Sequence, residues 1–234
     1  MRFSEYYQDK NVATDYDARR MKGIKASIVR LLERRAVLDL LPRGNLKILE
    51  AGVGTGYFTE MLAKHGYLDG IDISKEMLQV LRKKIKNVSL MQADILSLKL
   101  LKKYDCIVSV RVISHFNKKD ASLALKNLAK CLTSAGTIIF NLENPSVLRR
   151  IGRKITNWGS TYTYQYSSSE IKQIIRYAKL NSVKTIYIDH LILYPLHIIN
   201  KISFGLFTNI ILRFEKSLEK FKFSSANVFI KCKN

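Results

Sequence analysis

One acid and three glycines at alternate positions form the densest candidate for chemistry in this sequence. Glu50 is followed by Gly52, Gly54 and Gly56, and the apolar residues 48 and 49 come directly before it. Glycines between a strand and a helix let the backbone approach a ligand closely, and they aim the free N–H groups of the helix start at that ligand. The spacing therefore predicts a binding site for a small molecule or cofactor.

Two nucleotide-binding motifs do not fit this spacing. The dinucleotide fingerprint requires G-x-G-x-x-G, and Tyr57 occupies the position of its third glycine. A phosphate-binding loop requires Gly-Lys-Ser/Thr, which does not follow these glycines. The remaining pattern is E-x-G-x-G-x-G, whose acid suits a cofactor with a cationic amino group and a sulfonium rather than a pyrophosphate.

Several motifs along the chain resemble, in order, those of the class I S-adenosylmethionine (SAM)-dependent methyltransferases. The glycine cluster resembles the first motif, residues 70–78 the second, residues 92–95 the third and residues 104–112 the fourth. Residues 132–138 resemble the entry to the fifth strand of that family. The resemblance extends over residues 45–142 and is greatest to the small-molecule branch (type 11, quinone-biosynthesis-like).

This resemblance implies SAM as the cofactor and S-adenosylhomocysteine (SAH) as the product. In the family, the acid at Asp72 holds the ribose hydroxyls, through charge-assisted hydrogen bonds. The acid at Asp94 faces the adenine amino group. The residues expected to bind the cofactor are Glu50, Gly52, Gly54, Thr55, Gly56, Asp72, Ile73, Met77, Asp94, Ile95, Arg111 and Arg20.

Two residues are candidates for the acceptor side. His115 follows the fourth-motif strand, where the family often carries a histidine beside the methyl group. Tyr16 lies in residues 15–20, which resemble the "YD…R" segment that lids the cofactor in small-molecule methyltransferases. Methyl transfer mainly requires proximity in a dry site, and a general base only where the acceptor holds its proton tightly. A structural histidine and a solvated surface helix remain the alternatives.

The elements that would position these residues alternate along the chain. The apolar patterns predict strands over residues 47–50, 68–73, 88–91, 104–112, 137–142, 183–188 and 226–231. They predict helices over residues 15–41, 57–64, 74–85, 119–131 and from a cap at Ser168 or Ser169 through Leu180, with two more in 191–225. Asn181 is a candidate for a left-handed helix stop.

This alternation predicts an α/β fold: a Rossmann-like, doubly wound sheet of seven strands, parallel except for an antiparallel C-terminal strand. A single domain over 1–234 is expected. It would comprise a helical N-terminal cap (1–44), a cofactor-binding core (45–142), and a substrate-side half (143–234) with a helical insertion at about 191–225 before the last strand.

The charge of the chain is unusual. Forty Lys and Arg residues against nineteen Asp and Glu give a net charge of +21. Such a surface attracts nucleic acid, anionic lipid or phosphorylated substrates, although lysines spread over solvated faces would give the same count. The densest basic cluster is residues 149–154, and the aromatic residues after it, Trp158, Tyr162, Tyr164 and Tyr166, are candidates for a pocket wall or for core.

The helical insertion has one apolar and one polar face. Leu206, Phe207, Ile210, Ile211, Phe214, Leu218 and Phe221 share the apolar side, and Asn209, Arg213, Lys216 and Lys220 share the other. Packing as core or as a substrate lid is the default expectation. A dimer interface and contact with an anionic membrane, to which Phe204 would also contribute, stay open.

The remaining composition favours a reduced, cytoplasmic protein. Cys106, Cys131 and Cys232 have no close spacing, which argues against disulfides and zinc, and no metal site is predicted. Residues 1–6 do not resemble a signal peptide, and no apolar run is long enough to span a membrane. We expect a cytoplasmic protein, with peripheral membrane contact as the alternative.

Three functional hypotheses follow. The leading one is methyl transfer from SAM to a small-molecule or a lipid- or sugar-linked acceptor. The second is a tRNA or rRNA methyltransferase, favoured by the +21 charge. Against it, the fourth-motif strand does not end in Asn/Asp-Pro-Pro-Tyr/Phe. The third is a SAM-binding module without catalysis.

Overall fold

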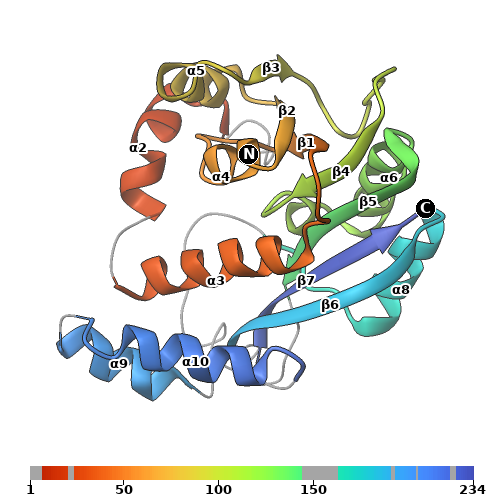
Figure 1. Ribbon diagram of the computed structural model, residues 1–234. Coiled ribbons are helices and arrows are strands. Elements are labelled where there is room, and N and C mark those ends of the chain that lie inside the picture. Colours follow the sequence, from red (N-terminus) through yellow and green to blue (C-terminus); the bar gives the residue numbers. More distant parts are fainter. Residues whose placement is uncertain (1–6, 21–23, 144–162, 191–192, 204, 222–224) are drawn as a thin grey trace.

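Seven strands form one sheet in the computed structural model, which describes residues 7–20, 24–143, 163–190, 193–203, 205–221 and 225–234 (Figure 1). The strands are β1 (Leu46–Ala51), β2 (Gly66–Asp72), β3 (Ser89–Gln92), β4 (Tyr104–Ser109), β5 (Leu132–Glu143), β6 (Asn181–His190) and β7 (Ser225–Lys233). The helices are α2 (Lys10–Arg20), α3 (Ile24–Leu40), α4 (Thr59–Ala63), α5 (Lys75–Lys84), η1 (Ile113–His115), α6 (Lys118–Ala129), α8 (Ser168–Tyr177), α9 (Tyr194–Ile202) and α10 (Thr208–Leu218).

The strand order confirms the predicted fold class. The order is β3-β2-β1-β4-β5-β7-β6, in which β1 to β5 pair in parallel and β7 lies antiparallel between β5 and β6. Within the sheet, the chain passes from β1 through β2 to the edge strand β3, and then crosses to β4 on the other side of β1. The carboxyl ends of β1 and β4 therefore form a topological switch point, where sheets of this kind bind ligands.

Helices cover both faces of the sheet, as a doubly wound fold requires. On one face, α6 and α8 pack through side chains such as Leu125 and Ile174. On the other face, α3 and α4 contribute Leu32 and Met61, and Ile211 of α10 joins the same cluster. The strands β1 and β4 are covered on both faces, so every residue in them is buried except exposed Lys47 and half-buried Asp105.

Three predictions about the helices are wrong. The single helix expected over 15–41 is two helices, α2 and α3, which run in different directions (Figure 1). Helix α8 is capped by Ser167, not by Ser168 or Ser169, because Glu170 completes a capping box with Ser167. The left-handed residue after α8 is Lys179, with φ 58°, and Asn181 already belongs to β6.

The strands also differ in their ends. The fourth-motif strand stops at Ser109 rather than at residue 112, because Arg111 adopts a left-handed conformation with φ 60°. Strand β5 begins at Leu132 rather than at residue 137. The three cysteines are buried and free.

The insertion forms the two expected helices, α9 and α10, but its apolar side is largely exposed. Only Ile211 of the seven predicted apolar-face residues is buried. The default expectation of core packing is therefore wrong for most of this face. No helix among the described residues is long and apolar enough to cross a bilayer.

Candidate functional site

A cavity of about 600 Å³ lies at the carboxyl ends of β1 and β4, the predicted switch point. Twelve predicted site residues line it: Tyr16, Glu50, Gly52, Gly54, Thr55, Asp72, Ile73, Met77, Asp94, Ile95, Arg111 and His115. The loops after four neighbouring parallel strands supply most of this lining, with α2 and η1 at its edges. The structure thus gathers residues that lie up to 99 positions apart, from Tyr16 to His115, around one space.

The glycine loop is shaped by its surroundings in three different ways. Gly52 has φ 86°, and a Cβ there would meet Val112 Cγ2 at 2.2 Å, so the loop packs directly on the turn after β4. Gly54 has φ 53°, and a Cβ there would meet no atom within 4 Å. Since Gly54 lines the cavity, its missing side chain leaves a cradle for a ligand.

Gly56 serves the packing of the loop rather than the cavity. Its φ is 93°, and a Cβ would meet Leu81 Cδ1 of α5 at 2.3 Å. It is not among the residues that line the cavity. The sequence pattern of alternate glycines did not distinguish this packing role from contact with a ligand.

Glu50 is a buried acid at the floor of the cavity. Its side chain accepts a hydrogen bond from Thr59 Oγ1 at 2.7 Å. Burial, together with the nearby charge of Asp72, raises the pKa of Glu50 to about 8 in spite of that hydrogen bond. A buried carboxyl of this kind favours a ligand that brings a positive charge.

Asp72 is held rigidly by backbone amides. Gly54 N donates to Oδ2 at 2.8 Å and Ser74 N donates to Oδ1 at 2.9 Å. Burial nevertheless raises the pKa of Asp72, because it outweighs these hydrogen bonds. Each carboxylate oxygen can accept further hydrogen bonds, so the fixed carboxylate can still receive hydroxyl donors from a ligand.

The other predicted cofactor residues flank these acids. Asp94 follows β3 and accepts a hydrogen bond from Leu96 N at 2.9 Å, which orients one of its oxygens. Ile73, Met77 and Ile95 supply apolar surface to the same part of the lining. These three apolar residues and Asp94 form an apolar slot with an acid at one edge. Such a slot suits a flat heterocycle that carries an exocyclic hydrogen-bond donor, such as an amino group.

Arg111 lines the cavity, but its charge is bound to a partner that sequence analysis did not identify. The guanidinium Nε lies 2.7 Å from Glu33 Oε1 of α3, and Nη2 lies 2.5 Å from the same oxygen. Its backbone N donates to Asn141 Oδ1 at 2.6 Å. The structural role of Arg111 is thus to join the turn after β4 to α3 and β5.

Aromatic side chains surround His115 at one end of the cavity. His115 is buried on η1, and its ring centroid lies 6.2 Å from that of Tyr7. The Tyr7 ring meets Tyr16 edge-on at 5.9 Å. Tyr164 reaches the same lining, because its backbone N donates to Ser114 O at 2.7 Å. The two acceptor-side candidates, His115 and Tyr16, therefore face the same cavity, with Tyr7 between them.

Helix α2 is fastened over the glycine loop. Thr55 Oγ1 donates to Asp17 Oδ1 at 2.5 Å, and Lys84 of α5 forms an ion pair with the other oxygen of Asp17. Although burial opposes ionisation, these two hydrogen bonds hold the pKa of Asp17 below its usual value. Ser74 Oγ also donates to Tyr7 O at 2.7 Å. These contacts keep the N-terminal segment closed on the cavity.

Several lining residues escaped the sequence analysis. Arg30 of α3 is buried, lies 4.1 Å above the Tyr57 ring and lines the cavity together with it. Asn117 and Asp120 line it at the start of α6, where Asn117 caps the helix. The cap pattern could have located the helix start, but only the topology brings that start to the cavity.

Some predicted residues lie outside the part of the chain that the structure describes. These are the basic cluster at 149–154, Trp158, Tyr162, Phe204 and the side chain of Arg20. Tyr166, which was a candidate for the pocket wall, is buried and hydrogen-bonded to Phe116 O instead. Within the described residues, no group of three or more His, Cys, Asp or Glu side chains could hold a metal ion.

The described residues fit a nucleoside that carries a cationic tail. The Gly54 cradle leaves room for close backbone approach, Asp72 offers a fixed acceptor for two hydroxyls, and buried Glu50 offers a counter-charge. SAM and SAH, implied by the motifs, have these groups.

Comparison with known proteins agrees with this geometry. Residues 48–136 match the family model described as "Methyltransferase domain". The chain is 35% identical over 101 residues to a malonyl-[acyl-carrier protein] O-methyltransferase of Priestia megaterium, which covers 41% of this chain and 36% of that protein. A protein of the same name from Bacillus anthracis is 31% identical over 135 residues, or 56% of this chain and 48% of its own length.

Two solved structures share the fold over nearly their whole length. A SAM-dependent methyltransferase from Thermotoga maritima superposes with a TM-score of 0.68 at 20% identity, covering 97% of this chain and 98% of that one. Magnesium protoporphyrin IX methyltransferase from Synechocystis PCC 6803, solved with bound SAH, gives 0.66 at 18% identity, covering 97% and 96%. The chain spans less than half the length of the curated relatives that it matches. The resemblance to class I SAM-dependent methyltransferases that the motifs predict is confirmed, and the branch within them stays a prediction.

Proposed function

We propose that this chain, whose residues 48–136 match a methyltransferase domain, is a class I SAM-dependent methyltransferase that transfers a methyl group to a small-molecule acceptor beside His115. The single observation that supports this proposal most is the convergence of Glu50, Asp72 and Asp94 with a cluster of tyrosines on one cavity. SAM, when bound, supplies an electrophilic methyl group for in-line displacement. The protein then has to hold the acceptor close and exclude water.

The cofactor would be held from both ends. In this proposal Asp72 accepts the ribose hydroxyls and Asp94 receives the adenine amino group, while Glu50 faces the cationic tail. Gly52, Gly54 and Thr55 approach the cofactor through the backbone, and the remaining predicted contacts are Ile73, Met77, Ile95 and Arg20. Gly56 supports the site from behind through Leu81, whereas Arg111 lines the cavity and is held by Glu33.

His115 and Tyr16 form the acceptor side of this proposal. Both face the aromatic end of the cavity, and His115 is buried. An imidazole there can take a proton from an acceptor hydroxyl or amine, and the Tyr16 hydroxyl can orient it. For an acceptor that is already an anion, such as a carboxylate, the two would position the oxygen and move no proton.

The relatives indicate which acceptors to test first. Those named malonyl-[acyl-carrier protein] O-methyltransferases suggest an acyl carboxylate, either free or linked to a carrier. Arg30 lies in the lining and would place a positive charge near such an anion. Lipid- and sugar-linked acceptors remain in the same class.

RNA is the second candidate, because the net charge is +21. A tRNA or rRNA methyltransferase should bind bulk tRNA tightly at low salt, with an affinity that falls steeply as salt rises. Absence of such binding would remove this candidate. A SAM-binding module without turnover would bind SAH but form none from SAM with any acceptor.

The test is SAH formation from SAM with defined acceptors: small carboxylic acids, malonyl-acyl carrier protein and bulk tRNA. We expect turnover with a small or carrier-linked acceptor, and H115A should lower it at least about tenfold without weakening SAH binding. Turnover with tRNA alone would contradict the proposal. Loss of SAH binding in H115A would place His115 in the cofactor pocket instead.

A further inference from the structure

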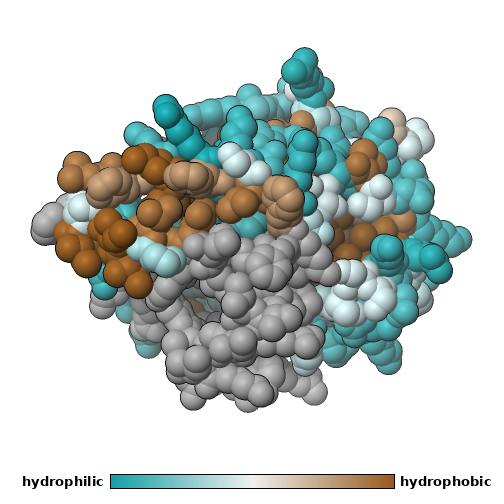
Figure 2. All heavy atoms as spheres, turned by 90° about the horizontal axis from the view of Figure 1, so that it is seen from below, coloured by the Kyte–Doolittle hydropathy of each residue, from teal (hydrophilic) through white to brown (hydrophobic). Residues whose placement is uncertain are grey.

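Eight large apolar side chains are exposed on one side of the helical pair α9 and α10. They are Ile198, Ile199, Ile202, Leu206, Phe207, Ile210, Phe214 and Phe221, and we call them the apolar hairpin face. Leu206 is 81% exposed, Ile202 74% and Phe214 52%. Figure 2 shows hydrophobic surface gathered over these helices. A contiguous exposed patch of this kind marks a site of contact with a partner or a membrane.

The opposite side of α10 is anchored firmly to the core, so the exposed face is not a poorly packed core helix. Ile211 is fully buried against the sheet, and Glu215 is hydrogen-bonded to His190 at 2.8 Å. Arg35 Nη1 of α3 donates to Leu212 O at 3.1 Å. The helical pair therefore has a defined orientation, in which Ile211 and Glu215 point inward and the residues of the apolar hairpin face point outward.

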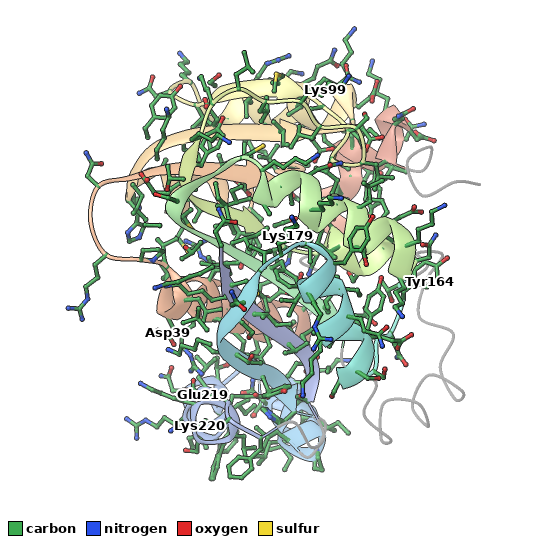
Figure 3. The ribbon with its side chains drawn as sticks, turned by 90° about the vertical axis from the view of Figure 1, so that its right-hand side faces the viewer. Asp39, Lys99, Tyr164, Lys179, Glu219 and Lys220 are labelled. Carbon is green, nitrogen blue, oxygen red and sulfur yellow. The ribbon has the colours of Figure 1, made fainter. Side chains whose placement is uncertain are left out.

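The exposed charges on the helical pair α9 and α10 and the residues after it have one sign. Every exposed charged side chain among the described residues of 193–221 is basic: Lys201, Arg213, Lys216 and Lys220. Of the two acids of this segment, Glu215 is buried with His190, and Glu219 is partly exposed and pairs with Arg35. Figure 3 shows Glu219 and Lys220 at the end of the molecule opposite Lys99. The apolar hairpin face is thus flanked by uncompensated positive charge.

We propose that the apolar hairpin face docks onto the surface of a bilayer that contains anionic lipid. Isoleucine, leucine and phenylalanine side chains would enter the boundary between head groups and acyl chains, and the flanking lysines and arginine would contact the phosphates. This combination fits lipid better than the alternatives. RNA offers phosphates but little surface for eight exposed aliphatic and phenyl groups, and a second copy of this chain would bring the same basic edges together.

Flotation with vesicles tests the proposal on the full chain. Phosphatidylcholine vesicles are compared with vesicles that contain about three-tenths phosphatidylglycerol. We expect flotation with the anionic vesicles, weakened by salt, and little with phosphatidylcholine alone. L206S/F214S should lower the fraction bound at least about tenfold, because two exposed side chains lose their partition into lipid. K216E/K220E should lower binding to the anionic vesicles and leave binding to the phosphatidylcholine vesicles unchanged.

L101S is the matched control, since Leu101 is fully exposed but follows Lys99 at the far end of the molecule. It should bind vesicles as the unchanged protein does. All variants should keep the melting temperature and SAH affinity, which separates this proposal from the proposed activity. Absence of flotation at low salt would overturn it. The proposal would also be overturned if sedimentation showed that L206S/F214S dissociates a dimer while vesicle binding is unchanged. Binding of tRNA that depends on the same apolar residues would overturn it as well.

Discussion

The Thr55 hydroxyl donates a hydrogen bond to Asp17 Oδ1 at 2.5 Å and so joins the glycine loop to helix α2. Lys84 binds the other oxygen of Asp17 and donates to Thr55 O at 3.0 Å. Three segments of the chain meet at this carboxylate. Because Tyr7 and Tyr16 belong to the N-terminal segment, the same contact holds the aromatic end of the cavity closed.

Breaking this contact should weaken ligand binding more than it weakens the fold. In D17A, Thr55 and Lys84 lose their acceptor and α2 is freed from the loop. We expect the SAH affinity to fall about fivefold, equivalent to about 1 kcal/mol for one hydrogen-bonded contact. Calorimetric titration measures it, with D15A in the same helix as the control. Equal affinities for D17A and D15A would contradict the role of this contact.

Gly54 and Gly44 allow the cradle to be tested with a matched pair. Both have positive φ, 53° and 118°, and a Cβ at either would meet no atom within 4 Å. Alanine should therefore destabilise each by about 1 kcal/mol through the backbone alone. Only Gly54 lines the cavity. We expect G54A to lower SAH affinity at least about tenfold and G44A to leave it unchanged, since a methyl group fills the space of the ligand only in G54A.

The pH dependence of stability should report on Glu50. A carboxyl whose pKa is raised from 4.5 to about 8 binds its proton more tightly in the folded protein than in the unfolded chain. Between those values the folded state holds more protons, so its stability falls as the pH rises. The ligand-free protein should therefore melt at a lower temperature at about pH 8 than at about pH 5, and E50Q should reduce this difference.

E50Q also separates stability from function. The amide can still accept from Thr59, so the variant should melt higher than the unchanged protein at about pH 8. It should nevertheless bind SAH more weakly, because the counter-charge for the amino group is gone. Binding of SAH to the unchanged protein should release a proton, seen as a buffer-dependent heat. If the melting temperatures of E50Q and the unchanged protein changed with pH in the same way, the raised pKa of Glu50 would be contradicted.

The His190–Glu215 pair predicts a pH effect of the same sign, in a range that begins above the unfolded pKa of histidine. Both ring nitrogens of His190 face acceptors, Glu215 Oε2 at 2.8 Å and Phe221 O at 3.0 Å. Although burial opposes the charge, these contacts raise the pKa of His190. The stabilisation is fully present below the unfolded value of 6.5 and is lost as the pH rises through the raised pKa.

Removal of the buried acid should be costly. We expect E215Q to lower the free energy of unfolding by about 3 kcal/mol at about pH 6, because it leaves a buried imidazolium with a neutral partner. E219Q is the control, since Glu219 is partly exposed and lies 3.8 Å from Arg35, and it should cost less than about 1 kcal/mol. Urea denaturation measures both. A similar loss in the two variants would contradict the special role of the His190 pair.

Local sequence patterns predicted most of the cofactor side, because their residues follow consecutive strands. Glu50, Asp72 and Asp94 end strands whose order is set by the alternation of elements, so their convergence follows from topology. Arg111 and Gly56 were placed on the ligand by their position in a motif. The structure adds packing partners for both, Glu33 for Arg111 and Leu81 for Gly56. These lie 78 and 25 residues away in sequence, and no local pattern records such contacts.

The acceptor side was harder to predict for the same reason. Arg30 and Tyr57 stack across two elements, and Asp120 reaches the cavity only through the placement of α6. Competition between neighbours decided the ends of α8: Ser167 rather than Ser168 or Ser169 caps it, because only Ser167 has Glu170 three positions later. The exposure of α10 was missed because periodicity shows which residues share a face but not whether another element covers it.

Calorimetric titration of SAH into the ligand-free protein, together with E50Q and D72A, tests the central claim most directly. We expect one SAH per chain and weaker SAH binding in both variants. The analogue 5′-methylthioadenosine lacks the amino-acid tail, so D72A should weaken its binding and E50Q should not. That result would place the ribose at Asp72 and the amino group at Glu50. No heat and no rise in melting temperature at saturating SAH would contradict the assignment of this cavity.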